Sequence, residues 1–426
     1  MRRFARPVER FARLEAGSAL VLLAAALAAL AWANISSSGY ESFWHERLSL
    51  TLGGLALNED LRTWVNDLLM AVFFFLIALE VKREVLFGEL SDRRLAVTPV
   101  AAAIGGMVVP AGIYLAINSG GGGSLDGWAI PVATDVAFAL GVLAVIGKMA
   151  PGPLRAFLLT VAIVDDIGTI LIIAVFFSEG ISLVWLGAAA GCAIGIYLLR
   201  RLSFRHLAPY AVLAAVTWLA VHESGVHATI AGVLLGLLTP AVPFHRPGPT
   251  ADVISGQLAE LRKDADRDVT EDTMRQVARF ADEAASPLAR MEAAVHPWSA
   301  YLVLPLFALA NAGVPITLDG LGEVATGAIG LGIILGLVVG KPLGLFAATA
   351  LAVRISGARL PQGVDLWAIV CLGFVAGIGF TVALFISALA LPDPGELEQA
   401  KTAILLASVL GSLLGVIGFA LRHARR

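Results

Sequence analysis

Residues 153–178 read PLRAFLLTVAIVDDIGTILIIAVFFS, an apolar run with two adjacent acidic residues, Asp165 and Asp166, in its middle. A helix of about 20 apolar residues crosses the ~30 Å hydrocarbon core of a bilayer. This run is therefore long enough to span a membrane, and it would carry both carboxyl groups to the bilayer centre. An ionisable side chain there costs about 2.5–3.5 kcal/mol on insertion scales. Charges placed at such a cost indicate a function.

Apolar runs of this kind recur over the whole chain of 426 residues, which is 58% hydrophobic and 15% charged. A soluble globular protein carries about 25% charged residues, so this composition is typical of a polytopic membrane protein. Backbone groups in lipid must be satisfied internally, which predicts helices. We therefore expect one all-α transmembrane domain over residues 1–426. Its twelve expected spans are 14–34, 61–86, 95–118, 127–147, 153–178, 182–200, 207–222, 225–241, 295–315, 325–353, 365–391 and 399–421.

The Lys and Arg residues gather on one side of these spans. Of the 30 such residues, all but four fall in the two terminal segments and in alternate loops. The exceptions are Arg47, Arg62 and Lys401 on the other side and Lys341 within a span. Because an excess of Lys and Arg marks the cytoplasm, both termini are expected to be cytoplasmic. A signal peptide is the alternative for the N-terminal segment, but its apolar stretch exceeds a typical h-region of about 7–15 residues, which favours a retained span.

Two polar stretches interrupt the spans. The outer one, residues 35–60, has alternating Leu residues around Gly53-Gly54, a pattern typical of a β-hairpin, with an irregular loop as the alternative. An isolated hairpin is marginal alone, so we expect this one to pair with another subunit. The cytoplasmic one, residues 245–294, is rich in Asp, Arg and Ala and predicts one or two solvated helices, for example Thr270 to Ala285. It serves either as a connector or in regulation.

Glycine recurs every four residues in four of the spans. This spacing places small residues on one helix face and lets helix backbones approach closely. The positions are Gly187, Gly191 and Gly195; Gly232 and Gly236; Gly332, Gly336, Gly340 and Gly344; and Gly411 and Gly415. We expect tight helix packing at these faces.

Asp135 and Lys341 also lie well inside apolar runs. With the acidic pair they make three acids and one base, so the four cannot all form ion pairs. Ion pairs that merely hold helices together are the structural alternative, and this mismatch counts against it. The spans contain no cluster of Cys and His that would indicate a transition-metal site, and no cofactor is expected. No motif indicates nucleotide or nucleic-acid binding.

The spans that hold Asp135 and Thr381 are both expected to be interrupted. Pro131 lies just before Thr134-Asp135 and disfavours a continuous helix there, and the eleventh span contains Gly373, Gly377 and Gly379. Two interrupted spans, one in each half of the chain, are typical of a transporter site built from broken helices. Asp135 is expected to face helix N-termini and Lys341 to face C-termini.

Adjacent acidic residues on a helix point about 100° apart. One of Asp165 and Asp166 is therefore expected to line a cavity while the other contacts a neighbour such as Lys341. Two nearby carboxylates disfavour simultaneous ionisation, and burial disfavours charge, so the pair is suited to exchanging protons for a cation. Oxygen ligands suit a hard cation such as Na⁺.

Several stretches along the chain resemble the NhaA antiporter family. They are Leu79-Glu80-Val81-Lys82-Arg83-Glu84, Gly127-Trp128-Ala129-Ile130-Pro131 with Ala133-Thr134-Asp135, Val164-Asp165-Asp166-Ile167-Gly168, Ser224-Gly225-Val226-His227-Ala228-Thr229, His296-Pro297-Trp298, Gly340-Lys341-Pro342-Leu343-Gly344 and Gly377-Ile378-Gly379-Phe380-Thr381. Because the matches run in order over nearly the whole chain, the resemblance is specific.

The resemblance implies an inverted-repeat fold of twelve transmembrane helices in which broken spans four and eleven cross near the site. It implies that Asp165 and Asp166 bind Na⁺ or Li⁺ and protons, supported by Asp135 and Lys341, with Thr134 at the crossing. It also implies a homodimer in a bacterial inner membrane, surrounded by membrane lipid, with the outer hairpin at the dimer interface.

The same resemblance links the cytoplasmic ends of spans two and nine to activation by pH. The matching positions are Glu80, Arg83, Glu84, Glu292 and His296. This chain departs from the family pattern in two ways that bear on the pH set-point: Ala293 stands where a histidine is often found, and the cytoplasmic segment before Glu292 is expanded. The alternatives are a solvated helix end for Glu80, Arg83 and Glu84, and packing or capping for His227 and His296.

The predicted function is electrogenic Na⁺(Li⁺)/H⁺ antiport by alternating access, regulated by pH and serving Na⁺ and pH homeostasis. A sodium-coupled symporter for an organic solute would need a mid-membrane Arg or aromatic cluster, which the spans lack. A passive channel would show flux without proton coupling. A membrane enzyme is disfavoured because no Ser/His or metal constellation lies within the spans.

Overall fold

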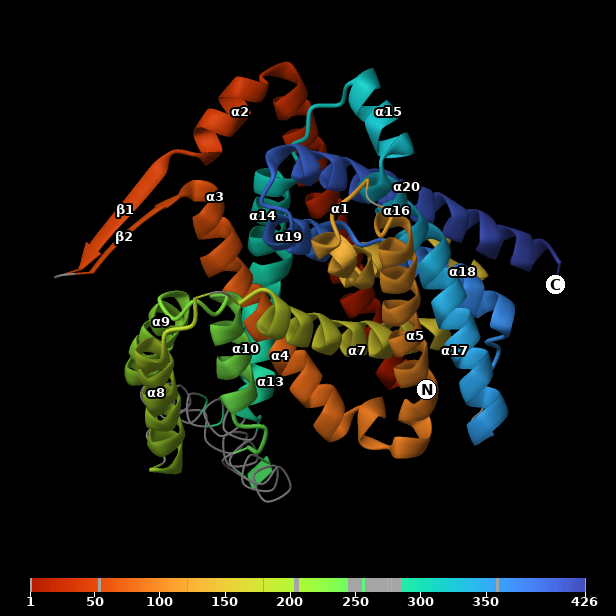
Figure 1. Cartoon of the computed structure of the whole chain (residues 1–426). Helices are drawn as coiled ribbons and strands as arrows, with labels where there is room; N and C mark the ends of the chain where they lie inside the picture. The colour runs from red at the N-terminus through yellow and green to blue at the C-terminus, as the bar shows by residue number, and fades with distance from the viewer. Residues whose placement is uncertain are drawn as a thin grey trace.

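The computed structural model describes residues 2–52, 55–120, 122–178, 180–202, 207–243, 285–357 and 360–425, with a few residues between 255 and 277. These residues form a bundle of helices with a two-stranded sheet that projects from its edge (Figure 1). The helix expected over 270–285 lies almost entirely outside the described residues.

The N-terminal half contains the sheet and the first group of helices. Its elements are α1 Arg2–Ile35, α2 Ser37–Trp44, β1 Arg47–Leu52, β2 Leu55–Asp60, α3 Leu61–Trp64, η1 Val65–Leu69, α4 Met70–Phe87, η2 Glu89–Ser91, α5 Arg93–Asn118, η3 Asp126–Val132, α6 Val136–Ile146, η4 Gly147–Met149, α7 Pro153–Phe176, α8 Leu183–Arg201, α9 Leu207–His222 and α10 Thr229–Leu238. The regular elements described in the C-terminal half are all helices. Its elements are α13 Pro287–Trp298, η5 Ser299–Val303, α14 Leu304–Asn311, α15 Leu318–Thr326, α16 Ala328–Leu335, η6 Gly336–Gly340, α17 Lys341–Ser356, α18 Leu366–Ala376, α19 Phe380–Ala390 and α20 Pro394–Ala424.

Within the described residues, nine helical segments are long and apolar enough to cross a membrane. A tenth is the pair α18 and α19, which is bent by 53° at a short break. Two shorter apolar helices, Ala208–His222 and Thr229–Leu238, occupy the positions of expected spans seven and eight. The chain is thus a multi-span helical membrane protein, and each of the twelve expected spans corresponds to a helical segment.

Two expected boundaries were wrong, and in both cases a helix cap explains why. The ninth span begins at Pro287 rather than 295, because the Ser286 hydroxyl accepts a hydrogen bond from Ala289 N and Pro287 occupies the first turn. The twelfth begins at Pro394 rather than 399, because Asp393 caps it in the same way. Lys401, which was assigned to the outer side at the start of the expected span, therefore lies two turns inside α20 and is buried.

The first helix packs into the bundle. Its residues Leu22, Ala26, Ala29 and Ala33 are buried and belong to the main apolar core. Alanine at these positions lets α1 lie close to α14 and α6, its main neighbours. This packing favours the interpretation of residues 14–34 as a span of the folded protein.

The expected hairpin is confirmed as an antiparallel pair of strands. The register pairs Arg47 with Asp60 and Leu52 with Leu55, which leaves two residues, 53 and 54, between the strands and outside the described part. The hairpin is fixed to the bundle at its base, where Trp64 Nε1 donates to Leu48 O at 3.1 Å. Hydrogen bonds from Thr63 and His45 outweigh the opposing effect of burial on Asp60, so the pKa of its carboxyl lies below the ordinary value.

The helix faces with glycine at every fourth position fall into two groups, those packed against a neighbouring backbone and those that are not. Where α5 crosses α17, a Cβ on Gly344 would collide with the carbonyl oxygen of Gly105, and a Cβ on Gly340 would lie 2.9 Å from Pro110 Cα. These glycines bring backbones into contact, as expected. In α8, by contrast, a Cβ on Gly187 or Gly191 would meet nothing within 4 Å. The close packing expected for those two positions is not present within the described chain.

Gly344→Ala is expected to destabilise the fold by about 1–3 kcal/mol, because the added methyl group meets a backbone that cannot move aside alone. The matched control is Gly191→Ala, which adds the same group in open space and removes a poor helix former. Thermal unfolding of the two purified variants in detergent measures the difference. Equal melting temperatures for both variants would contradict the inferred contact.

Candidate functional site

The two interrupted spans meet at their breaks. Between η3 and α6 the backbone of Ala133 is extended, and between α18 and α19 the chain breaks at Gly377–Gly379. The backbone N–H of Asp135 donates to Ile378 O at 2.6 Å, which joins one break to the other. Irregular backbone at membrane depth is tolerated where it is buried in protein or lines a cavity. The expected pair of broken helices is therefore present, and the breaks are in direct contact.

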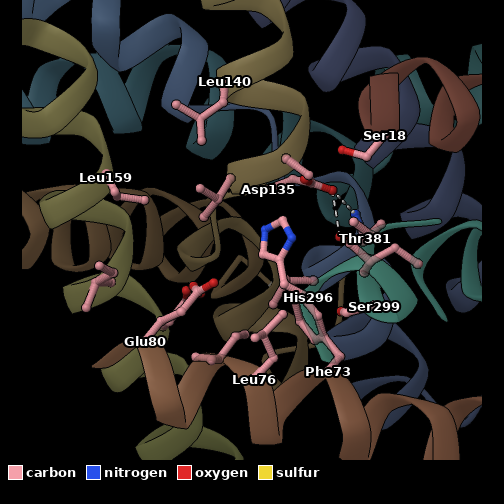
Figure 2. Close-up of a pocket in the computed structure, with 18 of the residues that line it drawn as sticks. Ser18, Phe73, Leu76, Glu80, Asp135, Leu140, Leu159, His296, Ser299 and Thr381 are labelled. Atoms are coloured by element: carbon pink, nitrogen blue, oxygen red, sulfur yellow. Dashed lines mark hydrogen bonds between the residues drawn. The ribbon is translucent and has the colours of Figure 1, made fainter. Parts of the chain in front are cut away.

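Asp135 stabilises the starts of two half-helices at once. Its Oδ1 accepts a hydrogen bond from Phe138 N at 3.0 Å and so caps α6. Its Oδ2 accepts from Thr381 N at 3.0 Å and from Thr381 Oγ1 at 2.6 Å, at the start of α19 (dashed lines, Figure 2). A negative charge is favoured at a helix N-terminus, so one carboxylate offsets two helix dipoles. The expectation that Asp135 faces helix N-termini is confirmed.

Lys341 lies on the other side of the same crossing. It opens α17 directly after the π-helical turn η6, and it is fully buried. Its Nζ donates to Val132 O at 2.5 Å, where η3 ends, and to Asp165 Oδ2 at 2.7 Å. The ammonium group thus satisfies a carbonyl freed by the break and forms a buried ion pair with α7.

Asp165 and Asp166 differ in their surroundings as the helix geometry predicted. Asp165 is 1% exposed, and its Oδ2 also accepts a hydrogen bond from Thr134 Oγ1 at 2.8 Å. Asp166 lines a cavity of about 120 Å³ together with Thr134, Asp135 and Thr381. A cavity of this size accommodates several waters. One carboxylate is therefore locked in an ion pair, and its neighbour faces a space that an ion can enter.

Four of the five residues expected to respond to pH line the same cavity. They are Glu80, Arg83, Glu292 and His296. Arg83 Nη1 lies 3.3 Å from Glu292 Oε1, which links α4 to α13. Figure 2 shows the ring of His296 between the side chains of Glu80 and Asp135. The fifth, Glu84, is placed elsewhere and accepts a hydrogen bond from Glu89 N at 2.6 Å.

His227 is placed in a packing role. Its ring lies edge-on to Phe385 with the ring centroids 5.2 Å apart, and its Nδ1 is 2.9 Å from Thr229 Oγ1. Its Nε2 is 3.8 Å from Asp67, which also lies 3.4 Å from His222. The grouping of this acid with two histidines was not predicted from the sequence. The signal was available, since Asp67 is a further acidic residue inside an apolar run.

Two hydroxyl groups in the cavity wall were also missed. Ser18 of α1 and Ser299 of η5 both line the cavity, and in Figure 2 they lie on the side of Asp135 and Thr381. A single Ser in an apolar helix carries no pattern that marks it as functional. Only the packing of α1 against α6, and of η5 against α1 and α4, brings these two groups to the cavity.

The sequence of this chain matches that of a known family of transporters. A family described as Na⁺/H⁺ antiporter 1 matches residues 9–419. The chain belongs to the Na⁺/H⁺ antiporter 1 family. The match extends from the first described transmembrane segment into the last and includes both broken spans and the acidic pair.

Individual members of the Na⁺/H⁺ antiporter 1 family match over nearly their full lengths. The Na⁺/H⁺ antiporter NhaA of Rhodopirellula baltica is 44% identical over 418 residues, which are 97% of this chain and 93% of that relative. NhaA 2 of Sorangium cellulosum is 45% identical over 96% of this chain and 88% of its own length. NhaA of Salmonella arizonae is 42% identical over 96% of each chain. The family resemblance drawn from the motifs is confirmed.

Proposed function

We propose that this membrane protein is a Na⁺/H⁺ antiporter that exports Na⁺ and takes up protons at the Asp165/Asp166 pair. It is a transporter and not an enzyme. The observation that carries the proposal is the difference in surroundings between the two acids. Asp166 faces the cavity, while Asp165 forms a buried ion pair with Lys341. Na⁺ from the cytoplasm displaces protons from these carboxylates. The loaded site then opens outward, where protons displace Na⁺. Li⁺, a hard cation of the same charge, uses the same oxygens.

Thr134 and Asp135 support this exchange by holding the crossing in place. Thr134 binds Asp165, and Asp135 binds the start of α19. If the two acids release two protons for each Na⁺ bound, one net positive charge enters the cell per cycle. Each charge is worth about 2.3 kcal/mol per 100 mV, so an interior-negative potential drives Na⁺ export.

Four charged or titratable groups of the cavity wall are proposed to set the response to pH. Glu80, Arg83, Glu292 and His296 all line the cavity, and the Arg83–Glu292 ion pair joins α4 to α13. A change in protonation among these groups alters the charge that an incoming cation meets. This regulation couples transport to Na⁺ and pH homeostasis.

The same proposal includes location and assembly. Residues 1–426 form one transporter domain in a bacterial inner membrane, in contact with lipid, with both termini and the loop 245–294 in the cytoplasm; the distribution of Lys and Arg supports this. The loop 35–60 is outside. Within the described residues its two strands pair with no further strand, and an exposed edge readily pairs with another chain, which supports a homodimer through the hairpin.

The direction of charge movement tests the proposed exchange. Proteoliposomes adsorbed to an electrode receive a jump in external Na⁺. With two protons leaving for each Na⁺ that enters, the net charge displacement is opposite to the movement of Na⁺. A symporter or a channel would move positive charge in the direction of Na⁺, and that sign would overturn the proposal.

A further inference from the structure

Helix α7 carries two buried oxygen atoms that have no hydrogen-bond partner among the described residues, Asp165 Oδ1 and Thr169 Oγ1. Both residues are 1% exposed. Because they are four positions apart on a helix, their side chains are neighbours on one face. Buried polar atoms are nearly always hydrogen-bonded, so a pair of exceptions side by side calls for an explanation.

Thr169 also differs from other hydroxyl residues of the spans. Thr160, Ser178 and Thr217 each donate to the carbonyl oxygen four residues earlier, at 2.7–3.1 Å. Such a bond is the usual way for a helical Ser or Thr to satisfy its hydroxyl group in an apolar environment. For Thr169 the acceptor would be the carbonyl of Asp165, and this bond is not formed. Its oxygen is therefore available to another group at the level of the acidic pair.

An unpartnered hydroxyl elsewhere in the spans provides a comparison for Thr169. Thr349 of α17 is equally buried and also lacks a partner within the described chain. The residues one turn before and after it, Leu345 and Val353, are apolar. Thr169, in contrast, lies one turn from a carboxylate whose other oxygen is already held by Lys341 and Thr134.

We propose that Thr169 Oγ1 and Asp165 Oδ1 together bind the transported cation, at a position reached after Asp166. This inference rests on the proposed function. A hydroxyl is a neutral oxygen ligand that a hard cation accepts without any proton being released. The adjacent position, Gly168, packs against α5, where a Cβ would collide with Met107 Sδ, and a thioether is a poor ligand for such an ion. Thr169 thus contributes to affinity for the ion, whereas the carboxylates carry the exchange.

The test separates affinity from turnover. Thr169→Val keeps the shape of the side chain and removes the oxygen, Thr169→Ser keeps the oxygen, and Thr349→Val is the matched control. Each variant is reconstituted in proteoliposomes, and the KM and maximal rate are measured for Na⁺ and for Li⁺. We expect Thr169→Val to raise the KM for Na⁺ about tenfold at a maximal rate near that of the original protein. Thr169→Ser and Thr349→Val should keep the original KM.

Several results would overturn the inference. An unchanged KM for both ions in Thr169→Val would mean that the two oxygens hold only water. An equal rise in Thr349→Val would mean that any buried hydroxyl has this effect. If Thr169→Val does not fold, Thr169→Ala gives the same comparison. The outcomes stay distinguishable from failure of the proposed function, which would appear as exchange retained in Asp166→Asn whatever Thr169 does.

Discussion

Asp166→Asn is expected to abolish Na⁺-dependent proton movement, with a loss of at least about 100-fold in rate. Asparagine is similar in size to aspartic acid, but it has no proton to release and no charge to offer to Na⁺. Because Asp166 lines the cavity, its loss removes the group that an entering ion meets. The measurement is the Na⁺-induced pH change in everted membrane vesicles, followed with a pH-sensitive dye.

Glu84→Gln serves as the control for this result. It also removes one acidic charge, but Glu84 lies on α4, accepts a hydrogen bond from Glu89 N and does not line the cavity. Exchange by this variant should remain close to that of the original protein. Undiminished exchange in Asp166→Asn at equal expression would refute the assignment of the ion site.

Lys341→Met is expected to lower the free energy of unfolding by about 3–5 kcal/mol, the usual cost of leaving one partner of a buried ion pair uncompensated. Lys341 is fully buried and its Nζ lies 2.7 Å from Asp165 Oδ2, so its removal leaves a carboxylate without its counter-charge. It also leaves the carbonyl of Val132 without a donor. Thermal unfolding in detergent measures the change.

The double variant Asp165→Asn with Lys341→Met separates charge from packing. Removing both charges takes away the uncompensated carboxylate, so most of the lost stability should return. The remaining loss then reports on Val132 O and on altered packing. If the double variant is as unstable as Lys341→Met alone, the ion pair is not the cause of the instability.

The sequence predicted the spans well because lipid imposes a strict rule on the backbone. Apolar runs and the positions of Lys and Arg identified the segments, and Pro131 and Gly377 marked the two breaks. The errors lay at helix ends, where Ser286 and Asp393 extend helices into polar sequence by capping them. A cap depends on one side chain, and a search for apolar runs passes over it.

The site was predictable to the extent that charge in an apolar run is rare. Asp135 and Lys341 were predicted in that way, and both lie at the crossing of the broken spans. The 100° between adjacent helical residues indicated that the two acids would differ. Ser299 and Thr169 were not found, because a hydroxyl in an apolar helix usually bonds to its own backbone. The hydroxyls that do not bond to their own backbone can be recognised only from the arrangement of the neighbouring helices.

The single carboxylate shared by the two half-helices limits how the protein can rearrange. Asp135 holds Phe138 N through one oxygen and Thr381 through the other, so α6 and α19 cannot separate without breaking hydrogen bonds in an apolar interior. The helices α6 and α19 are therefore expected to move together as one rigid body. Any motion that exposes Asp166 to the opposite side must then tilt both together or happen in the helices around them.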